Sequence, residues 1–195
     1  MSNKTQTRET YHHGDLPDTL IKEGARLLAE SGVEGFSLRQ VARRAGVTVA
    51  APSHHFGSAR GLLTAIATEG FTRLARQMEA TAASDCNPEE VIILMCKAYV
   101  EMGLTEPGYA SVMFRLDLLD AEDERFRHRA FDAFELLKAA FRDAAPDKAT
   151  EAQVSTATMA LWATMHGIMV LPMIESENAE KIIRSTVCSH LAGMQ

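Results

Sequence analysis

Basic side chains are concentrated in one stretch of this chain, and their chemistry suits contact with a nucleic-acid backbone. Between Gly35 and Thr68 there is no aspartate or glutamate, whereas four arginines and two adjacent histidines occur there. Positive groups without acidic neighbours attract phosphate through a term that does not depend on base sequence. The stretch is therefore predicted to approach DNA.

The charge of the remaining chain restricts that contact to the N-terminal part. The 195 residues carry a net charge of −6, yet residues 1–60 sum to +2 and the rest of the chain to −8. The acidic part would repel phosphate. We therefore expect a small basic head, residues 1–60, that binds DNA, and a larger acidic body, residues 61–195.

The sequence lacks the residue patterns that enzymes and metal sites require. It has no nucleophile placed with a base, no glycine-rich phosphate loop and no cluster with metal-ligand spacing. No catalytic residue, cofactor or metal site is predicted, and the pair His12 and His13 is interpreted as polar residues ahead of a helix. The three cysteines, an odd number, are expected to be reduced.

No segment has the length and apolar character of a membrane span. The chain contains no run of 18 or more apolar residues, and its N-terminus lacks a basic region followed by an apolar core. Neither a membrane span nor a secretion signal is predicted, and a cytoplasmic location is expected.

The spacing of apolar residues predicts an all-α fold. Apolar residues recur at intervals of three and four, while alternation of β-branched residues is scarce. Asp15 is expected to cap the first helix and Ser37 the second, with Gly46 ending the latter. About nine helices are predicted: 15–31, 38–44, one after Gly46, one from Ser58 into the low eighties, 88–104, one after 106–108, 123–145, 149–174 and 177–194.

Residues 37–56 have the pattern of a helix-turn-helix. Ala42 is small enough to let two helices cross closely, Gly46 supplies the turn, and Val47 returns an apolar side chain to the core. The second helix would enter a major groove with its N-terminal residues first. Pro52 lies in this helix; with Thr48 as the cap it would be the fourth helical residue and would lose at most one hydrogen bond. A shift of the cap by one residue would remove even that cost.

The N-terminal segments resemble the DNA-binding domain of the tetracycline-repressor (TetR) family. The resemblance rests on GARLLAESGVEGFSLRQVARRAGV, on the segment ending HHF, and on GSARGLLTAI, within a block from about Asp15 to Phe71. YHHGDL, together with Trp162 and His166-Gly167 in LWATMHGIMVL, is similar to a subgroup named for a Trp-His-Gly signature. The resemblance implies a homodimeric transcriptional regulator, usually a repressor, that binds a palindromic operator and is released by a small molecule in its C-terminal domain.

The resemblance also assigns residues to DNA contact. It places Ser37 near a phosphate and His55 on the DNA backbone. It also places the four residues 48–51 on the leading face of the recognition helix. Ser53 stands where the family usually has a tyrosine, and Ala59 where it usually has a lysine, whose charge Arg60 can supply from another direction. The predicted DNA-binding residues are Ser37, Arg39, Arg44, Thr48, Val49, Ala50, Ala51, Ser53, His54, His55 and Arg60.

These departures lead to two expectations about DNA binding. With fewer phosphate anchors, affinity should depend less steeply on salt, unless arginines of the second helix compensate. The apolar reading residues offer contacts to thymine methyl groups and no bidentate base pairing, so DNA shape is expected to carry more of the specificity.

Aromatic and methionine residues of the body form the candidate ligand site. Such a lining would suit an apolar or aromatic ligand, with Arg115 and His166 as polar contacts. Ordinary core packing explains most of these residues equally well, and a structural tryptophan beside a hydrogen-bonded histidine explains Trp162 and His166. The predicted ligand-binding residues are Met113, Phe114, Arg115, Phe131, Phe134, Trp162, Met165, His166 and Met169.

The last two predicted helices, about 149–172 and 178–192, are expected to form a four-helix dimer interface. The apolar stripe Ile182, Ile183, Val187 and Leu191 supports this, although packing within one chain would give the same stripe. Two functions remain: a DNA-binding repressor released by a small molecule, or a DNA-binding regulator whose C-terminal domain only dimerises or binds a protein. The absence of catalytic patterns argues against an enzyme.

Overall fold

The structure, a computed structural model, describes residues 16–171, 174 and 176–194. In this part of the chain it contains nine α-helices and no β-strand, which confirms the all-α prediction. His12, His13 and Asp15 lie outside the described residues, so their predicted roles stay predictions. The helices are α1 Leu16–Ser31, α2 Leu38–Arg44, α3 Ala50–Phe56, α4 Ala59–Ala82, α5 Pro88–Thr105, α6 Pro107–Met113, α7 Glu124–Ala144, α8 Glu151–Val170 and α9 Ser176–Ala192.

Polar side chains satisfy exposed backbone N–H groups where helices begin. The Ser37 hydroxyl accepts a hydrogen bond from the N–H of Gln40 at 3.3 Å, as predicted, and Asn87 accepts one from the N–H of Glu90 at 2.9 Å. Thr150 forms a capping box with the residue three positions later. Because these caps are local in sequence, the helix starts could be predicted well.

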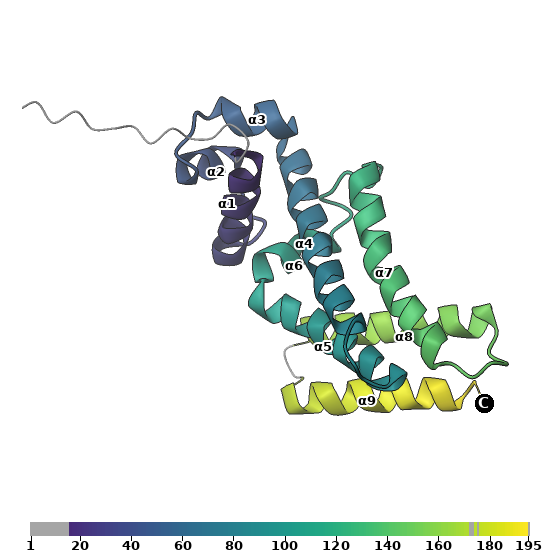
Figure 1. Cartoon of the computed structure of the whole chain (residues 1–195). Helices are drawn as coiled ribbons and strands as arrows, with labels where there is room; N and C mark the ends of the chain where they lie inside the picture. Colours follow the sequence, from purple (N-terminus) through teal and green to yellow (C-terminus); the bar gives the residue numbers. More distant parts are fainter. Residues whose placement is uncertain (1–15, 172–173, 175, 195) are drawn as a thin grey trace, which may run out of the picture.

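The first three helices form the head (Figure 1). Val41 and Ala42 of α2 are completely buried, and the turn after α2 passes through Gly46, whose φ of 67° is the left-handed conformation that favours glycine. The half-buried Val47 follows and packs against the core. The predicted helix-turn-helix is therefore present, with α3 as its second helix.

Pro52 is accommodated in α3 without the loss of a backbone hydrogen bond. The helix begins at Ala50, after Val49, so the buried Pro52 is its third residue and not the fourth. The first N–H groups of a helix have no partner within it, and proline is tolerated in the first turn. The start of α3 one residue later than a cap at Thr48 therefore removes the cost of one hydrogen bond.

The long helix α4 joins the head to the body. Its first residues follow α3 directly, and further along it packs against α5, α6 and α7 (Figure 1). The predicted boundary at residue 60 falls within its first turn. The hydrophobic core is shared by the head and the body, since Leu20 in α1 and Val187 in α9 belong to the same cluster of buried residues.

A second connection between head and body is the close approach of α6 to α1. A β-carbon added to Gly108, near the start of α6, would lie 1.9 Å from the backbone oxygen of Ala25 in α1. Only glycine fits this distance. Nearby, Arg73 of α4 stacks over the Tyr109 ring, with the guanidinium carbon 4.5 Å from the ring centre, and bonds Glu106 at 2.9 Å.

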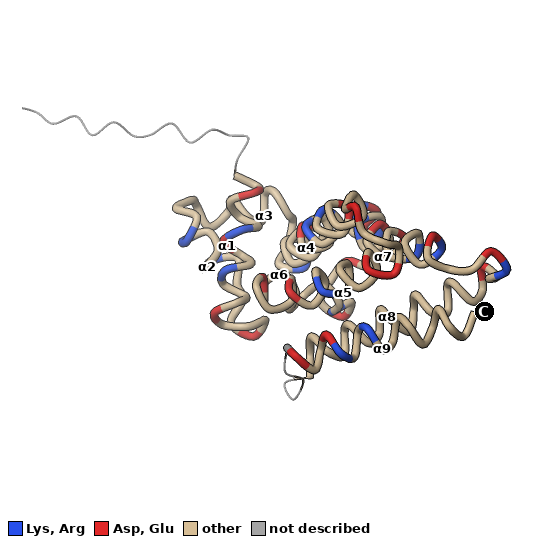
Figure 2. Tube along the Cα trace, turned by 60° about the horizontal axis from the view of Figure 1, so that its bottom comes forward, with Lys and Arg blue, Asp and Glu red and all other residues tan. Residues whose placement is uncertain are grey.

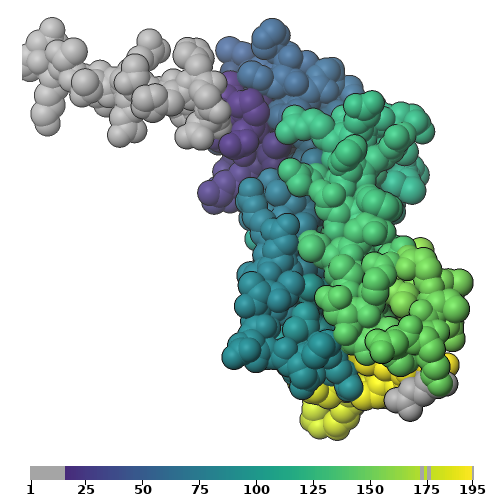
Figure 3. All heavy atoms as spheres, turned by 45° about the vertical axis from the view of Figure 1, so that its right-hand side comes forward, coloured from purple at the N-terminus to yellow at the C-terminus, as the bar shows by residue number. Residues whose placement is uncertain are grey.

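The helices α8 and α9 run antiparallel to each other at the end of the molecule opposite the head (Figures 1 and 3). This arrangement is the pair of successive helices that the dimer prediction requires. Ile183 and Val187 of α9 are buried within the chain, however. The predicted stripe therefore belongs in part to the core of one chain and not to an outer face.

Candidate functional site: a DNA-binding head on a helical body

The candidate reading surface is the exposed side of α3. Val49 is 59% exposed, Thr48, Ala50 and Ser53 are also exposed, and Ala51 is half-buried. No charged residue lies between Thr48 and Phe56, and Figure 2 shows the trace of α3 without acidic or basic colour. The side chains that could reach bases are small and apolar, which suits thymine methyl groups better than hydrogen-bonded readout.

The two histidines of α3 lie at its C-terminal end, and both are exposed. Their rings are 5.5 Å apart, and the ring of His55 is 6.3 Å from that of Phe56. Cationic or hydrogen-bonding side chains at this position can contact a DNA backbone. Backbone contact by His54 and His55 stays a prediction.

The arginines of α2 differ in their surroundings. Arg39 is exposed and has no ion-pair partner among the described residues. Arg44 instead binds Glu30 of α1 through both guanidinium nitrogens, at 2.9 and 2.5 Å. This hydrogen bonding holds the pKa of the Glu30 carboxyl below its usual range. A DNA phosphate would have to displace the Glu30 carboxylate to bind Arg44, whereas Arg39 could bind a phosphate directly.

Arg60 points to the body. One guanidinium nitrogen donates a hydrogen bond to the backbone oxygen of Asp117 at 3.0 Å, and the other donates to that of Leu119. One turn further along α4, the hydroxyl of Thr64 accepts a hydrogen bond of 2.9 Å from the N–H of Asp120. DNA contact by Arg60 remains a prediction, but both terminal nitrogens of its guanidinium already donate to the loop between α6 and α7.

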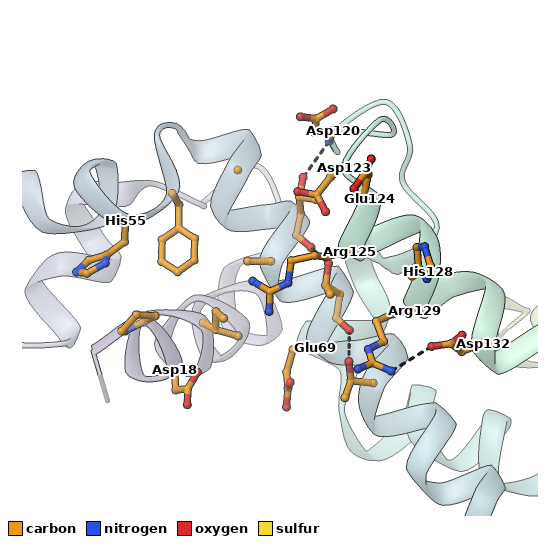
Figure 4. A pocket seen from close by; sticks show the side chains of 18 of the residues that line it. Asp18, His55, Glu69, Asp120, Asp123, Glu124, Arg125, His128, Arg129 and Asp132 are labelled. Carbon is orange, nitrogen blue, oxygen red and sulfur yellow. Dashed lines mark hydrogen bonds and ion pairs between the residues drawn. The ribbon is translucent and has the colours of Figure 1, made fainter. Parts of the chain in front are cut away.

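A cleft of about 1040 Å³ separates the head from α7. Figure 4 shows Asp120, Asp123 and Glu124 near the start of α7, and Arg125 and Arg129 extending from α7 towards α4. Three threonines of α4 line its wall, and each hydroxyl donates to the backbone oxygen four residues earlier, at 2.8 Å. They are Thr64, Thr68 and Thr72.

In the body, aromatic rings from α5, α7, α8 and the loop after α6 pack together around one hydrogen bond. The hydroxyl of Tyr99 lies 3.2 Å from Nδ1 of His166, and the Phe114 ring is 4.6 Å from the His166 ring. Trp162 lies edge-on to Tyr99 at 5.1 Å and to Phe134 at 5.7 Å. Burial raises the pKa of Tyr99 above its usual range, so its hydroxyl stays protonated and can donate or accept.

The structure brings together most of the predicted ligand residues and separates two of them. Met113 and Met165 are buried, and Met169 packs near Gly103 of α5. Arg115 and Phe131 were expected to face an interior space, and this is wrong. Phe131 is 62% exposed, and the exposed Arg115 is paired with Asp117 at 2.8 and 2.9 Å. Neither the large cleft nor a smaller one of about 210 Å³ between α1 and α6 is lined by a predicted ligand residue.

Two residues of the site could not have been selected from the sequence. Tyr99 lies in a run of apolar residues typical of a core helix, and nothing local distinguishes it as the partner of His166. Thr64 contacts a residue 56 positions away. Both roles depend on tertiary contacts that the spacing of residues does not encode.

The outer face of α8 is uncharged. Met159 is 57% and Val170 54% exposed, and Ala152, Thr156 and Ala163 on the same face are exposed as well. Figure 2 shows α8 without acidic or basic colour beyond its first residue. An exposed, largely apolar helix face of this length is typical of an association surface.

The described part of the chain shows neither a metal-ion cluster nor a helix that could span a membrane. Within the described ranges, no three histidine, cysteine or acidic side chains are grouped so that they could hold a metal ion. No helix in this part of the chain has the length and apolar character needed to cross a membrane.

A helix-turn-helix head with an exposed, uncharged second helix, joined by one long helix to a larger helical body, defines a DNA-binding regulator. Residues 20–66 match the family model described as "bacterial regulatory proteins, tetR family". Residues 92–176 match the model described as "tetracyclin repressor-like, C-terminal domain". The chain therefore belongs to the TetR family of transcriptional regulators, proteins that bind DNA, often bind small molecules and form dimers.

Solved structures share this fold. A protein of unknown function from Rhodococcus sp. RHA1 is 26% identical, with 96% of this chain and 99% of that chain covered and a TM-score of 0.78. The TetR family transcriptional regulator PfmR from Thermus thermophilus is 21% identical, with 90% and 98% covered and a TM-score of 0.68. The multidrug binding protein EbrR, in complex with imidazole, is 17% identical, with 90% and 94% covered and a TM-score of 0.62. No curated protein matches the sequence.

Proposed function

We propose that the protein is a dimeric repressor that binds a palindromic operator and is released from it by a small apolar or aromatic ligand. The observation that carries the proposal is the exposed, uncharged side of α3, presented by the Ser37-capped α2 and the Gly46 turn. In a symmetric dimer, two such helices would enter successive major grooves about 34 Å apart. The operator would then repeat the two-fold symmetry of the protein.

A shifted gel with DNA from beside the protein's own gene tests operator binding. Ala50→Glu places a negative charge on the exposed reading side of α3, and we expect it to abolish the shift because phosphate repels it. Ala139→Glu is the matched control, since Ala139 is an exposed residue of α7 on the body. Absence of a shift by the unsubstituted protein at low salt would refute the proposal.

The ligand is proposed to bind in the body near the Tyr99–His166 hydrogen bond. The surrounding rings favour an apolar or aromatic molecule, and the hydroxyl–imidazole pair offers it one polar contact. The similarly folded EbrR is described in complex with imidazole, which supports ligand binding by this type of body. The placement of Trp162 and His166 one turn apart on α8 supports membership of the Trp-His-Gly subgroup.

Native mass spectrometry of the purified protein tests for a bound small molecule, and DNA release by a panel of aromatic compounds tests its effect. If DNA binding persists in every case, the second function applies, in which the body only dimerises or binds a protein. One observation favours that alternative: the predicted ligand residues that are buried pack against each other and line neither of the two clefts described above.

The dimer is proposed to form through α8 and α9. The uncharged outer face of α8 supports this, because an exposed apolar face of this size is usually covered by a partner. The division into a DNA-binding domain of residues 1–60 and a ligand-binding and dimerisation domain of residues 61–195 belongs to the same proposal, as does a cytoplasmic location.

A further inference from the structure

Three hydrogen bonds join the start of α4 to the loop between α6 and α7. Arg60 donates to the backbone oxygens of Asp117 and Leu119, and Thr64 accepts from the N–H of Asp120. These contacts connect residues that are 56 to 59 positions apart in the sequence. Both terminal guanidinium nitrogens of Arg60 and the hydroxyl oxygen of Thr64 therefore form hydrogen bonds with the same loop.

The loop itself is anchored in the body. At one end, Phe114 packs against the rings of His166, Tyr99 and Phe71. Further along the loop, Leu119 is buried with only 1% of its surface exposed. The carbonyl groups that Arg60 holds are therefore fixed to the aromatic core of the body.

At the other end of the contact, the first turn of α4 determines where α3 lies. Only Gly57 and Ser58 separate the two helices, Gly57 has a φ of 72°, and the Ser58 hydroxyl accepts a hydrogen bond from the N–H of Gly61. With so short and well-defined a connection, a change in the direction of α4 is passed to α3.

We propose that Arg60 and Thr64 form a clamp on residues 117–120 that fixes the angle of the DNA-binding head relative to the body, so that Arg60 is a positioning residue and not a phosphate anchor. The proposal rests on DNA binding by the head as proposed above. It replaces the role that the sequence alone gave to Arg60, because both terminal nitrogens of its guanidinium already donate to backbone oxygens of the loop.

A fixed head angle has a measurable consequence for operator choice. One base pair more between half-sites moves them about 3.4 Å further apart along the DNA axis. A dimer with clamped heads cannot follow this change without strain, whereas freely tilting heads can. The clamp should therefore make the protein selective for one half-site spacing.

The test uses the full chain and operator duplexes that differ only by one base pair more or less between the half-sites. Four variants are compared: Arg60→Ala, Arg60→Lys, Thr64→Val and Thr64→Ser. Thr64→Val removes the acceptor hydroxyl without changing charge, and Thr64→Ser keeps it. Arg60→Lys keeps the charge but lacks the planar fork that reaches two oxygens. Thermal melting confirms that each variant is folded.

We expect Thr64→Val to reduce the preference for the best spacing by about fivefold, the factor that corresponds to one hydrogen bond. Arg60→Ala removes two hydrogen bonds and should reduce the preference by about 25-fold, whereas Arg60→Lys, which can keep one of them, should reduce it by about fivefold. The slope of log affinity against log salt should stay unchanged, and Thr64→Ser should behave as the unsubstituted protein. The proposal is overturned if Arg60→Ala lowers that slope by about 0.9 while Arg60→Lys restores it, or if the spacing preference is unchanged in Arg60→Ala and Arg60→Lys.

Hydrogen exchange separates failure of the clamp from failure of DNA binding, since it needs no DNA. We expect Thr64→Val to speed exchange of the Asp120 amide and of its neighbours in the loop, with amides in the middle of α5 unchanged. Unchanged exchange in the loop would overturn the clamp even where the protein binds DNA. Faster exchange in a protein that binds no operator would support the clamp and refute only the proposed function.

Discussion

Gly108 offers a sharp test of how the head is seated on the body. Replacing it with alanine adds one β-carbon, which would lie 1.9 Å from the backbone oxygen of Ala25 and 2.7 Å from its carbonyl carbon. Real β-carbons essentially never approach another atom within 3.0 Å, so α1 and α6 have to separate by about 1 Å. Both contacted atoms belong to the backbone of a buried helix face, so no side chain can rotate to make room.

The expected loss of stability follows from this geometry. Overpacking by a single carbon typically costs about 1–3 kcal/mol, and the rigid partner places Gly108→Ala at the upper end of that range. In a chain of this size, each kcal/mol lowers Tm by about 2–4 °C. We therefore expect Tm to fall by about 6–12 °C, measured by thermal unfolding monitored by circular dichroism.

Gly103→Ala is the matched control. Its added β-carbon would lie 2.3 Å from Cγ and Sδ of Met169, the outer part of a flexible side chain that can turn away. Alanine also favours the helix by about 1 kcal/mol relative to glycine, so Tm should change little. A Tm for Gly108→Ala equal to that of the unsubstituted protein, or an equal fall in both variants, would refute the reasoning.

Three further predictions concern the head, the dimer and a surface thiol. Arg39→Ala should make the fall of log affinity with log salt less steep by about 0.9. Arg44→Ala should change this steepness less, because its guanidinium is already paired. Equal changes for the two variants in salt titrations of operator binding would contradict this. Met159→Lys places a charge on the outer face of α8 and should raise the dimer Kd by about 100-fold or more; light scattering that shows an unaltered dimer would exclude this face. Glu89 accepts a hydrogen bond from the Cys188 thiol at 3.1 Å, which raises the pKa of that thiol. Glu89→Gln should therefore lower this pKa and speed alkylation of Cys188 at fixed pH, and a slower reaction would contradict the sign.

The elements of the fold could be predicted because their signals are local. Ser37 as a helix cap, Gly46 as a left-handed turn and Pro88 at the start of α5 each act within a few residues, and the structure has all three in these roles. The same local reasoning left the start of α3 before Pro52 open by one residue, because the exact start of a helix depends on small differences in backbone conformation.

The roles of individual polar residues could not be predicted in the same way. Arg60 and Arg44 are equally cationic in the sequence, but carbonyl groups of a distant loop hold the first and Glu30 holds the second. The prediction that Phe131 faces an interior cavity was also wrong, because this aromatic residue has the spacing of a core residue in α7 but is exposed to solvent. Tertiary packing decides which groups a side chain contacts, and residue type and spacing do not reveal these contacts.

The three threonines that line the cleft side of α4 affect how that helix deforms. Each hydroxyl adds a second hydrogen bond to a backbone oxygen one turn earlier, and such bonding weakens and bends a helix on the side where it occurs. With Thr64, Thr68 and Thr72 stacked on one side, α4 has a compliant edge towards the cleft and a stiffer edge opposite. The positions of the three threonines in the sequence therefore favour bending of α4 in one plane, the plane that contains the cleft side and the side opposite it.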